Sequence, residues 1–129
     1  MGNPKSRTIL MIDDDRDIVD STCRRLENEG YRTIAAFDAE QGIDSAVHCK
    51  PDAIILDVRM PGMNGINALT QLKQRAETKP IPVVMLSASV VDQNSCLDAG
   101  ARFFIKKPYL SKHLLAAVDT AMGEIDKNR

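Results

Sequence analysis

Acidic, hydroxyl and basic side chains directly follow four short apolar segments of this chain. In chain order they are Asp13, Asp14 and Asp15, then Asp57, then Ser87, and finally Lys106 and Lys107. Carboxylates about 5 Å apart repel by roughly 3 kcal/mol per pair at an effective dielectric constant of about 20, so a cluster of them needs a cation. Oxygen ligands of this kind suit Mg²⁺. With a cation bound, a carboxylate can attack a phosphoryl group while a lysine and a hydroxyl bind the transferring oxygens.

This chemistry requires the apolar segments to end at one edge of one sheet. The segment 53–56 is wholly apolar, which is typical of a strand buried on both faces of a parallel sheet. Five such segments alternate with helical patterns, and closely spaced βα units require right-handed parallel crossovers. The pattern predicts an α/β fold, a (βα)5 doubly wound parallel sheet. In the strand order 2-1-3-4-5, strands one and three are neighbours at the switch point, so Asp13 and Asp14 should meet Asp57 there.

Capping and turn residues indicate where the helices begin and end. Asp15 is interpreted as the N-cap of the first helix, where the helix dipole favours a carboxylate, and is left out of the site. A weaker fourth helix is expected over about 90–99, and Ser111 is expected to cap the last helix. A third helix is predicted from the near-helical spacing of Ile66, Leu69, Leu72 and Ala76.

Composition and charge limit the class of protein to which this chain can belong. Its 129 residues suffice for one domain, and 43% hydrophobic with 27% charged residues is typical of a globular protein with a real core. The formal net charge of -1 provides no positive field to hold nucleic acid or an anionic membrane. No apolar run approaches the ~18 residues of a membrane span. The 3 cysteines lack CxxC spacing, which argues against a disulfide framework and favours a cytoplasmic location.

Four motifs occur in the order in which a known family carries them. They are Ile12-Asp13-Asp14, Leu56-Asp57-Val58-Arg59-Met60-Pro61-Gly62-Met63-Asn64-Gly65, Leu86-Ser87-Ala88 and Lys107-Pro108. Together they resemble the receiver domain of two-component response regulators, over about residues 7–127. The resemblance implies a flavodoxin-like, or CheY-like, three-layer sandwich. Residues 1–6 are expected to form a disordered leader, and no output domain is expected in this chain.

The resemblance implies a metal site and a phosphoacceptor. Asp57 would receive the phosphoryl group and would also be a metal ligand. Asp14 would bind the metal directly, Asp13 would bind it through water, and the backbone carbonyl of Arg59 would complete the protein's share of ligands. The expected ion is Mg²⁺, with Mn²⁺ as a substitute.

The resemblance also implies a phosphoryl-binding pair and a switch. Lys107 would contact the phosphoryl group, and the bond that joins it to the following proline is cis in the family. Ser87 would supply the family's hydroxyl, and Phe104 would be the switch aromatic, at a position where many members have Tyr. Arg59 and Ser89 occupy two variable positions that tune the lifetime of the phosphoryl group in the family.

The expected function is that of a response regulator receiver. A phosphoryl group would pass from a sensor histidine kinase, a histidine phosphotransfer protein or a small donor to Asp57, in a magnesium-dependent step. Phosphorylation would then bias a two-state equilibrium and alter a surface near the fourth helix, the fifth strand and the fifth helix. Output would pass to a downstream protein or to an output domain outside this chain, or through a phosphorylation-dependent homodimer. The chain would catalyse its own phosphorylation and dephosphorylation without being an enzyme for an external substrate.

Four alternatives remain open at this point. The chain could be an interaction module that works without phosphorylation, or a phosphorelay intermediate from a larger regulator or hybrid kinase. An aspartyl-phosphate phosphatase usually has a second acid two residues after its nucleophile, where Arg59 stands here. A flavodoxin that binds FMN is disfavoured, because the carboxylates after the first strand would repel a phosphate unless a metal intervened.

Overall fold

The structure, a computed structural model, describes the chain from residue 7 to residue 127 and side chains from 7 to 123. The expected leader, residues 1–6, lies outside the described residues. The strands are β1 (Thr8–Ile12), β2 (Arg32–Ala36), β3 (Ala53–Asp57), β4 (Val83–Ser87) and β5 (Phe103–Lys106). The helices are α1 (Arg16–Asn28), α2 (Ala39–Cys49), α3 (Gly65–Gln74), the short 3-10 helix η2 (Val90–Asp92), α4 (Gln93–Asp98) and α5 (Ser111–Lys127).

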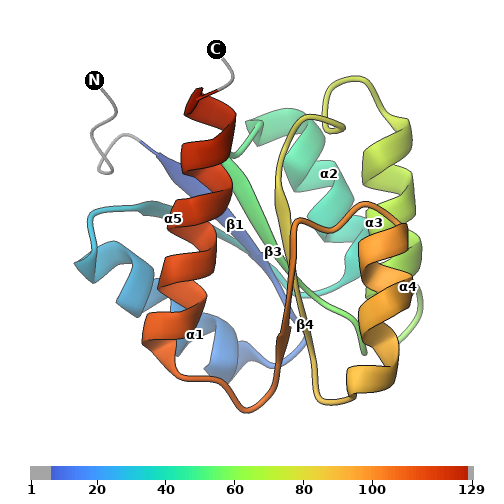
Figure 1. The fold of residues 1–129 in the computed structure, drawn as a ribbon, viewed down its shortest axis with the longest axis horizontal. Helices are drawn as coiled ribbons and strands as arrows, with labels where there is room; N and C mark the ends of the chain where they lie inside the picture. The colour runs from blue at the N-terminus through green and yellow to red at the C-terminus, as the bar shows by residue number, and fades with distance from the viewer. Residues whose placement is uncertain (1–6, 128–129) are drawn as a thin grey trace.

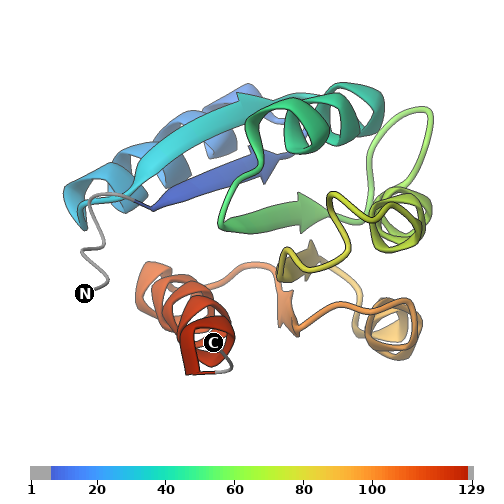
Figure 2. The ribbon, with the colours of Figure 1, turned by 90° about the horizontal axis from the view of Figure 1, so that it is seen from above.

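The sheet has the predicted topology. All its strand pairs are parallel, and the order is β2-β1-β3-β4-β5. Helices α1 and α5 cover one face, whereas α2, α3 and α4 cover the other (Figure 1). Seen from above, the strands form the middle layer between these two sets of helices (Figure 2). The predicted doubly wound, three-layer α/β fold is therefore confirmed.

Alternate residues of the central strands enter two different hydrophobic cores. In β1, Ile9 and Met11 pack toward α1 and α5, whereas Leu10 and Ile12 pack toward α2, α3 and α4. All four side chains are fully buried, as is every apolar residue of β3. Helices on both sides of a parallel sheet remove the polar face, which is why these strands show no alternation in sequence.

Three helix boundaries in the structure differ from those that the sequence predicts. Helix α3 ends at Gln74, and the buried hydroxyl of Thr78 donates to the Leu72 carbonyl at 2.6 Å, so Ala76 is exposed beyond the helix instead of facing the core. The fourth helix is shorter than expected, because the chain first forms η2, where the Val91 amide donates to the Ser89 hydroxyl. Helix α5 begins at Ser111, so Ser111 is its first residue and the prediction that Ser111 is the N-cap was wrong.

Membrane-spanning segments are absent from the described part of the chain. Each helix between residues 7 and 127 is too short or too polar to cross a bilayer.

Candidate functional site

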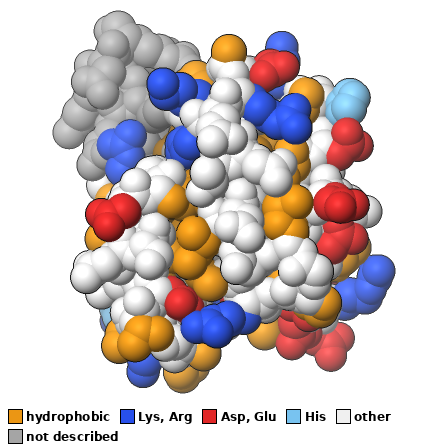
Figure 3. Space-filling view, turned by 90° about the vertical axis from the view of Figure 1, so that its right-hand side faces the viewer, with side chains coloured by type: hydrophobic (Ala, Val, Ile, Leu, Met, Phe, Trp, Pro, Cys, Tyr) orange, Lys and Arg blue, Asp and Glu red, His pale blue; other side chains and the backbone are white. Residues whose placement is uncertain are grey.

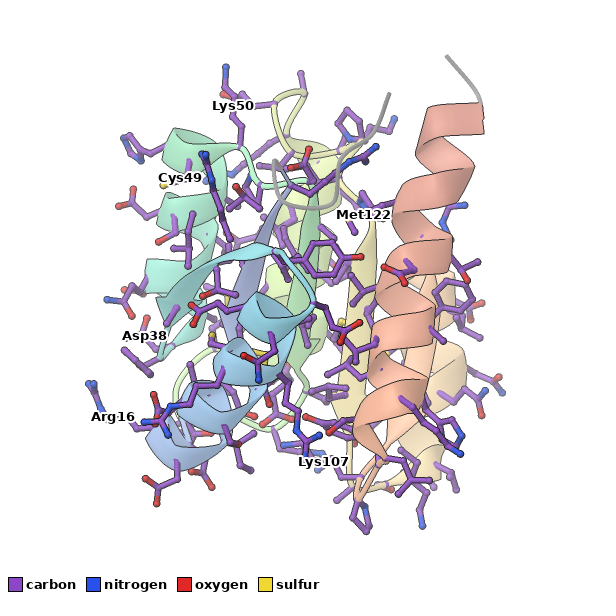
Figure 4. All side chains as sticks on the ribbon, turned by 90° about the vertical axis from the view of Figure 1, so that its left-hand side faces the viewer. Arg16, Asp38, Cys49, Lys50, Lys107 and Met122 are labelled. Atoms are coloured by element: carbon purple, nitrogen blue, oxygen red, sulfur yellow. The ribbon has the colours of Figure 1, made fainter. Side chains whose placement is uncertain are left out.

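The carboxyl edge of the sheet brings the candidate site residues together. Because the strands are parallel, their carboxyl ends meet at one edge. The pairing register places Ile12 opposite Leu56 and Asp57 opposite Leu86, so Asp13, Asp57 and Ser87 lie at nearly the same level of the sheet. Figure 4 shows Lys107 at this edge, at the opposite end of the molecule from Lys50, which precedes β3.

Three aspartates form an acidic cluster at this edge. One carboxylate oxygen from each of Asp13, Asp14 and Asp57 lies within 4.8 Å of the other two. Asp13 and Asp57 are buried, whereas Asp14 is exposed and leaves the cluster open to solvent. Asp15 is not in the cluster; its carboxylate caps α1 by accepting from the amides of Asp17 and Ile18, as predicted.

Lys107 provides the positive charge that the cluster contacts. Its Nζ lies 3.2 Å from Asp13 Oδ2 and 3.2 Å from Asp57 Oδ2. Its backbone amide donates to the Ser87 carbonyl at 2.8 Å, and the bond to Pro108 is cis. Burial lowers the pKa of Lys107, but Asp57 and Asp13 outweigh burial, and the net effect is a raised pKa. Lys107 therefore remains an ammonium, and one such group is too little to balance three carboxylates.

The donor set fits a hard divalent cation. The three groups that converge are carboxylates, with neither sulfur nor imidazole among them, and oxygen ligands of this kind suit Mg²⁺. The pKa of Asp57 also supports a cation site. Burial first, and then the charge of Asp13, raise the pKa of Asp57 to about 6, although Lys107 partly offsets both. A buried carboxylate with a raised pKa is destabilised in its charged form, and a bound cation would relieve that cost.

The titration of Asp57 predicts how stability depends on pH without a metal. The raised pKa, about 6 against an ordinary value of 3.8, means that proton binding by Asp57 stabilises the fold below pH 3.8. This contribution is lost as the pH rises through about 6. Asn at this position does not titrate, so Asp57→Asn is expected to increase the free energy of unfolding at neutral pH by ~3 kcal/mol.

Urea denaturation in EDTA between pH 4 and pH 7 checks this expectation, with each variant measured against wild type at every pH. The advantage of Asp57→Asn should grow with pH and should shrink when Mg²⁺ is added, because the wild-type site offers the cation one more carboxylate than the variant does. An advantage that is the same at pH 4 and pH 7 would contradict the raised pKa.

Ser87 lies at the same edge, but its hydroxyl points to a residue that the sequence did not single out. Ser87 Oγ donates to Asp92 Oδ2 at 2.7 Å and accepts from the Ser89 amide at 3.1 Å. Asp92 also accepts two hydrogen bonds from the guanidinium of Arg59. The only signal in the sequence was the polar stretch 92–94, which carries no spacing rule that would link Asp92 to Ser87.

Phe104, the expected switch aromatic, lies in β5. It pairs with Met85 across the sheet and is partly buried against the core on the side of α3 and α4. It therefore lies one strand away from Ser87 and close to the elements expected to change. Its role as a switch stays a prediction.

The loop after β3 returns close to Asp57 at the start of α3. The Gly65 amide donates to the Val58 carbonyl at 2.7 Å, and the Asn64 side chain caps α3 by accepting from the Asn67 amide at 2.9 Å. A Cβ on Gly65 would clash with the carbonyl oxygen of Asp57 and would lie 2.8 Å from Val58 Cα. Only glycine permits this close return, which holds the backbone around Asp57 in place.

Comparisons with known proteins identify relatives of the whole domain. A family model described as the response regulator receiver domain matches residues 9–119. The transcriptional regulatory protein PrrA of Mycobacterium tuberculosis is 38% identical over 115 residues, which are 88% of this chain and 48% of PrrA. The response regulator MprA of Mycobacterium avium is 37% identical over 108 residues, which are 84% of this chain and 47% of MprA. The chain thus spans about half the length of the curated relatives that it matches.

Solved structures share the fold over nearly the whole chain. A response regulator receiver domain protein (CheY-like) from Methanospirillum hungatei has a TM-score of 0.89 at 28% identity and covers 95% of this chain and 98% of its own. The receiver domain of the sensor histidine kinase PA1611 from Pseudomonas aeruginosa, with a magnesium ion coordinated in its active site cleft, has a TM-score of 0.84 at 26% identity. That match covers 91% of this chain and 98% of the other.

The fold and the acidic edge are those of a receiver-type α/β domain. The chain belongs to the response regulator receiver domain family. It is therefore a signalling domain of two-component systems and not a turnover enzyme for an external substrate.

Proposed function

We propose that this receiver domain accepts a phosphoryl group on Asp57 in a magnesium-dependent reaction. The observation that carries the proposal is the environment of this carboxylate, which is buried at the end of β3, joins two further carboxylates and contacts Lys107 at 3.2 Å. Asp13 is a less suitable acceptor, because it is more deeply buried and its Oδ1 already accepts from the Asp15 amide at 3.1 Å.

The chain's own residues account for most of the chemistry. An oxygen of the Asp57 carboxylate forms a bond to phosphorus while the bond from phosphorus to the donor's nitrogen or oxygen breaks, and the leaving group keeps that electron pair. The Lys107 ammonium stays beside the reacting oxygens and balances part of their charge. Asp13, Asp14, Asp57 and the Arg59 carbonyl would hold the metal. When bound, Mg²⁺ supplies positive charge to the carboxylates and to the transferring phosphoryl oxygens.

The switch follows from the negative charge of the phosphoryl group that Asp57 would carry. Ser87 and Lys107 must turn toward its oxygens, and Phe104 would occupy the space that they vacate. The surface that changes would include α4, β5 and α5. In support, Val90, Val91 and Leu97 are exposed at η2 and α4, where hydrophobic side chains could contact a partner. The side of the molecule that carries α3 and α4 shows hydrophobic side chains among charged ones (Figure 3).

The same proposal extends to partners and location. The donor would be a sensor histidine kinase, a histidine phosphotransfer protein or a small phosphate compound, and the phosphorylated domain would catalyse its own dephosphorylation. The recipient of the signal would be a downstream protein, an output domain or a second copy of this chain. Cys23, Cys49 and Cys96 are free thiols, which favours a cytoplasmic location.

Phosphorylation by acetyl phosphate tests the proposal directly. In Mg²⁺ the intact mass of the wild-type chain is expected to increase by one phosphoryl group, and Mn²⁺ should substitute. EDTA should prevent the increase, because unneutralised carboxylates repel the anionic donor. A chain that gains no mass in Mg²⁺ would refute the proposal and would favour an interaction module that works without phosphorylation.

A further inference from the structure

Asp92 connects two residues of the site that are far apart in sequence. Its Oδ2 accepts from Ser87 Oγ at 2.7 Å and from Arg59 Nε at 3.1 Å, and its Oδ1 accepts from Arg59 Nη2 at 3.0 Å. The Asp92 side chain is only 12% exposed, whereas that of Arg59 is 63% exposed. The carboxylate is thus shielded at the edge of the site and satisfied on both of its oxygens.

The single proton of the Ser87 hydroxyl is already used in a hydrogen bond in this arrangement. A serine hydroxyl has one proton to donate, and Ser87 gives it to a charged acceptor, which makes the bond stronger than one between neutral groups. The same oxygen accepts from the Ser89 amide, and Ser87 is completely buried, so water does not compete for it. A phosphoryl oxygen on Asp57 could receive this proton only if Asp92 gives it up.

The two bonds from Arg59 fix the acceptor in place. Arg59 presents Nε and Nη2 as a fork to both Asp92 oxygens, a geometry that orients the carboxylate as well as binding it. Arg59 comes two residues after Asp57, in the loop that leads to α3. The loop that follows the acceptor aspartate is therefore linked through Asp92 to the hydroxyl at the end of β4.

We propose that Asp92 is a positioning residue that withholds the Ser87 hydroxyl from the phosphoryl site in the resting domain. The inference rests on the proposed function, since it assumes that a phosphoryl group on Asp57 competes for Ser87. Asp92 is the last residue of η2 and directly precedes α4. Loss of the bond between Ser87 and Asp92 therefore releases the segment that carries exposed Val90 and Val91, which connects the phosphoryl group to the surface expected to change.

Affinity for beryllofluoride, an analogue of the phosphoryl group, measures this competition. With Mg²⁺ held constant, calorimetric titration should show that Asp92→Ala binds beryllofluoride about tenfold more tightly than wild type, which corresponds to ~1.4 kcal/mol. Asp98→Ala is the matched control, because it removes the same charged group from an exposed position in the neighbouring helix α4 and should leave the affinity unchanged. Asp92→Asn keeps the size of the side chain and can still accept a weaker bond from Ser87, so it should give a smaller gain.

A double variant separates the competition from simple charge removal. Deleting an acid near an anion site could tighten binding through the electric field alone, and that gain would persist in a Ser87→Ala background. If Asp92 acts through the hydroxyl, adding Asp92→Ala to Ser87→Ala should change the affinity by less than twofold.

The outcomes distinguish this inference from the proposed function. A wild-type domain that binds beryllofluoride, together with an Asp92→Ala variant that binds it no more tightly, overturns the role of Asp92 alone. An equal gain with and without Ser87 overturns it as well. Failure of every variant to bind the analogue in Mg²⁺ refutes the proposed function, and the inference about Asp92 falls with it.

Discussion

Asp57→Asn is expected to abolish phosphorylation of this domain by acetyl phosphate in Mg²⁺. The amide is neutral and is not a nucleophile, and it also removes one of the three carboxylates that would hold the cation. No other group should replace it. Asp13 lies deeper and already accepts from a backbone amide, and the exposed Asp14 has no contact with Lys107 among those described between residues 7 and 123.

The matched control for this variant is Asp15→Asn. It makes the same chemical change at a carboxylate outside the acidic cluster, and Asn caps a helix about as well as Asp. Intact mass after incubation with acetyl phosphate should therefore increase for Asp15→Asn as for wild type. Mass gain by Asp57→Asn equal to that of wild type would show that the acceptor is misassigned, and peptide mapping would then identify the residue that carries the phosphoryl group.

Gly65→Ala is expected to destabilise the fold by ~3 kcal/mol or more and to disrupt the backbone around Asp57. The new Cβ would meet backbone atoms of Asp57 and Val58, which cannot move aside as the end of a flexible side chain could. Relief of the clash requires α3 to move away from the end of β3. Since that movement shifts the Asp57 carboxylate relative to Lys107, the rate of phosphorylation in Mg²⁺ should fall together with stability.

Gly123→Ala is a control that is expected to change stability in the opposite direction. Gly123 lies in α5, and apart from its own stretch of helix a Cβ there would meet no atom within 4 Å among the side chains described up to residue 123. Alanine inside a helix is favoured over glycine by up to ~1 kcal/mol, so this variant should be slightly more stable than wild type. Chemical denaturation of both variants, with phosphorylation measured in parallel, checks the pair. A Gly65→Ala variant as stable as wild type would contradict the close approach of α3 to Asp57.

The acidic cluster could be predicted because it depends on chain order and topology alone. Asp13 and Asp57 each follow an apolar strand, and parallel strands that are neighbours in a doubly wound sheet end side by side. No accurate side-chain placement was needed for that prediction. The same reasoning placed Lys107 at the edge, although its position between two carboxylates depends on the turn after β5.

The contact of Asp92 with Ser87 could not be predicted from chain order and topology. This contact depends on the short helix η2, which has three residues and no apolar periodicity to mark it. Whether a carboxylate so placed meets a hydroxyl depends on the path of five residues after β4 and on the side chain of Arg59, which arrives from a different loop. The end of α3 was missed for a similar reason, because a hydroxyl at Thr78 satisfies the Leu72 carbonyl.

The sequence by itself determined the α/β class and the polar side chains that end each strand, because apolar runs and parallel crossovers follow from local patterns and from the connectivity of the chain. The strand order that brings these side chains together was expected from the doubly wound fold, and the structure confirms it. Only the tertiary structure decided which partner each of those side chains takes. Lys107 bridges Asp13 and Asp57, and Ser87 turns to Asp92. Hydrogen bonds and ion pairs act over about 3 Å, and distances that short between segments remote in sequence are set by how loops and helices pack.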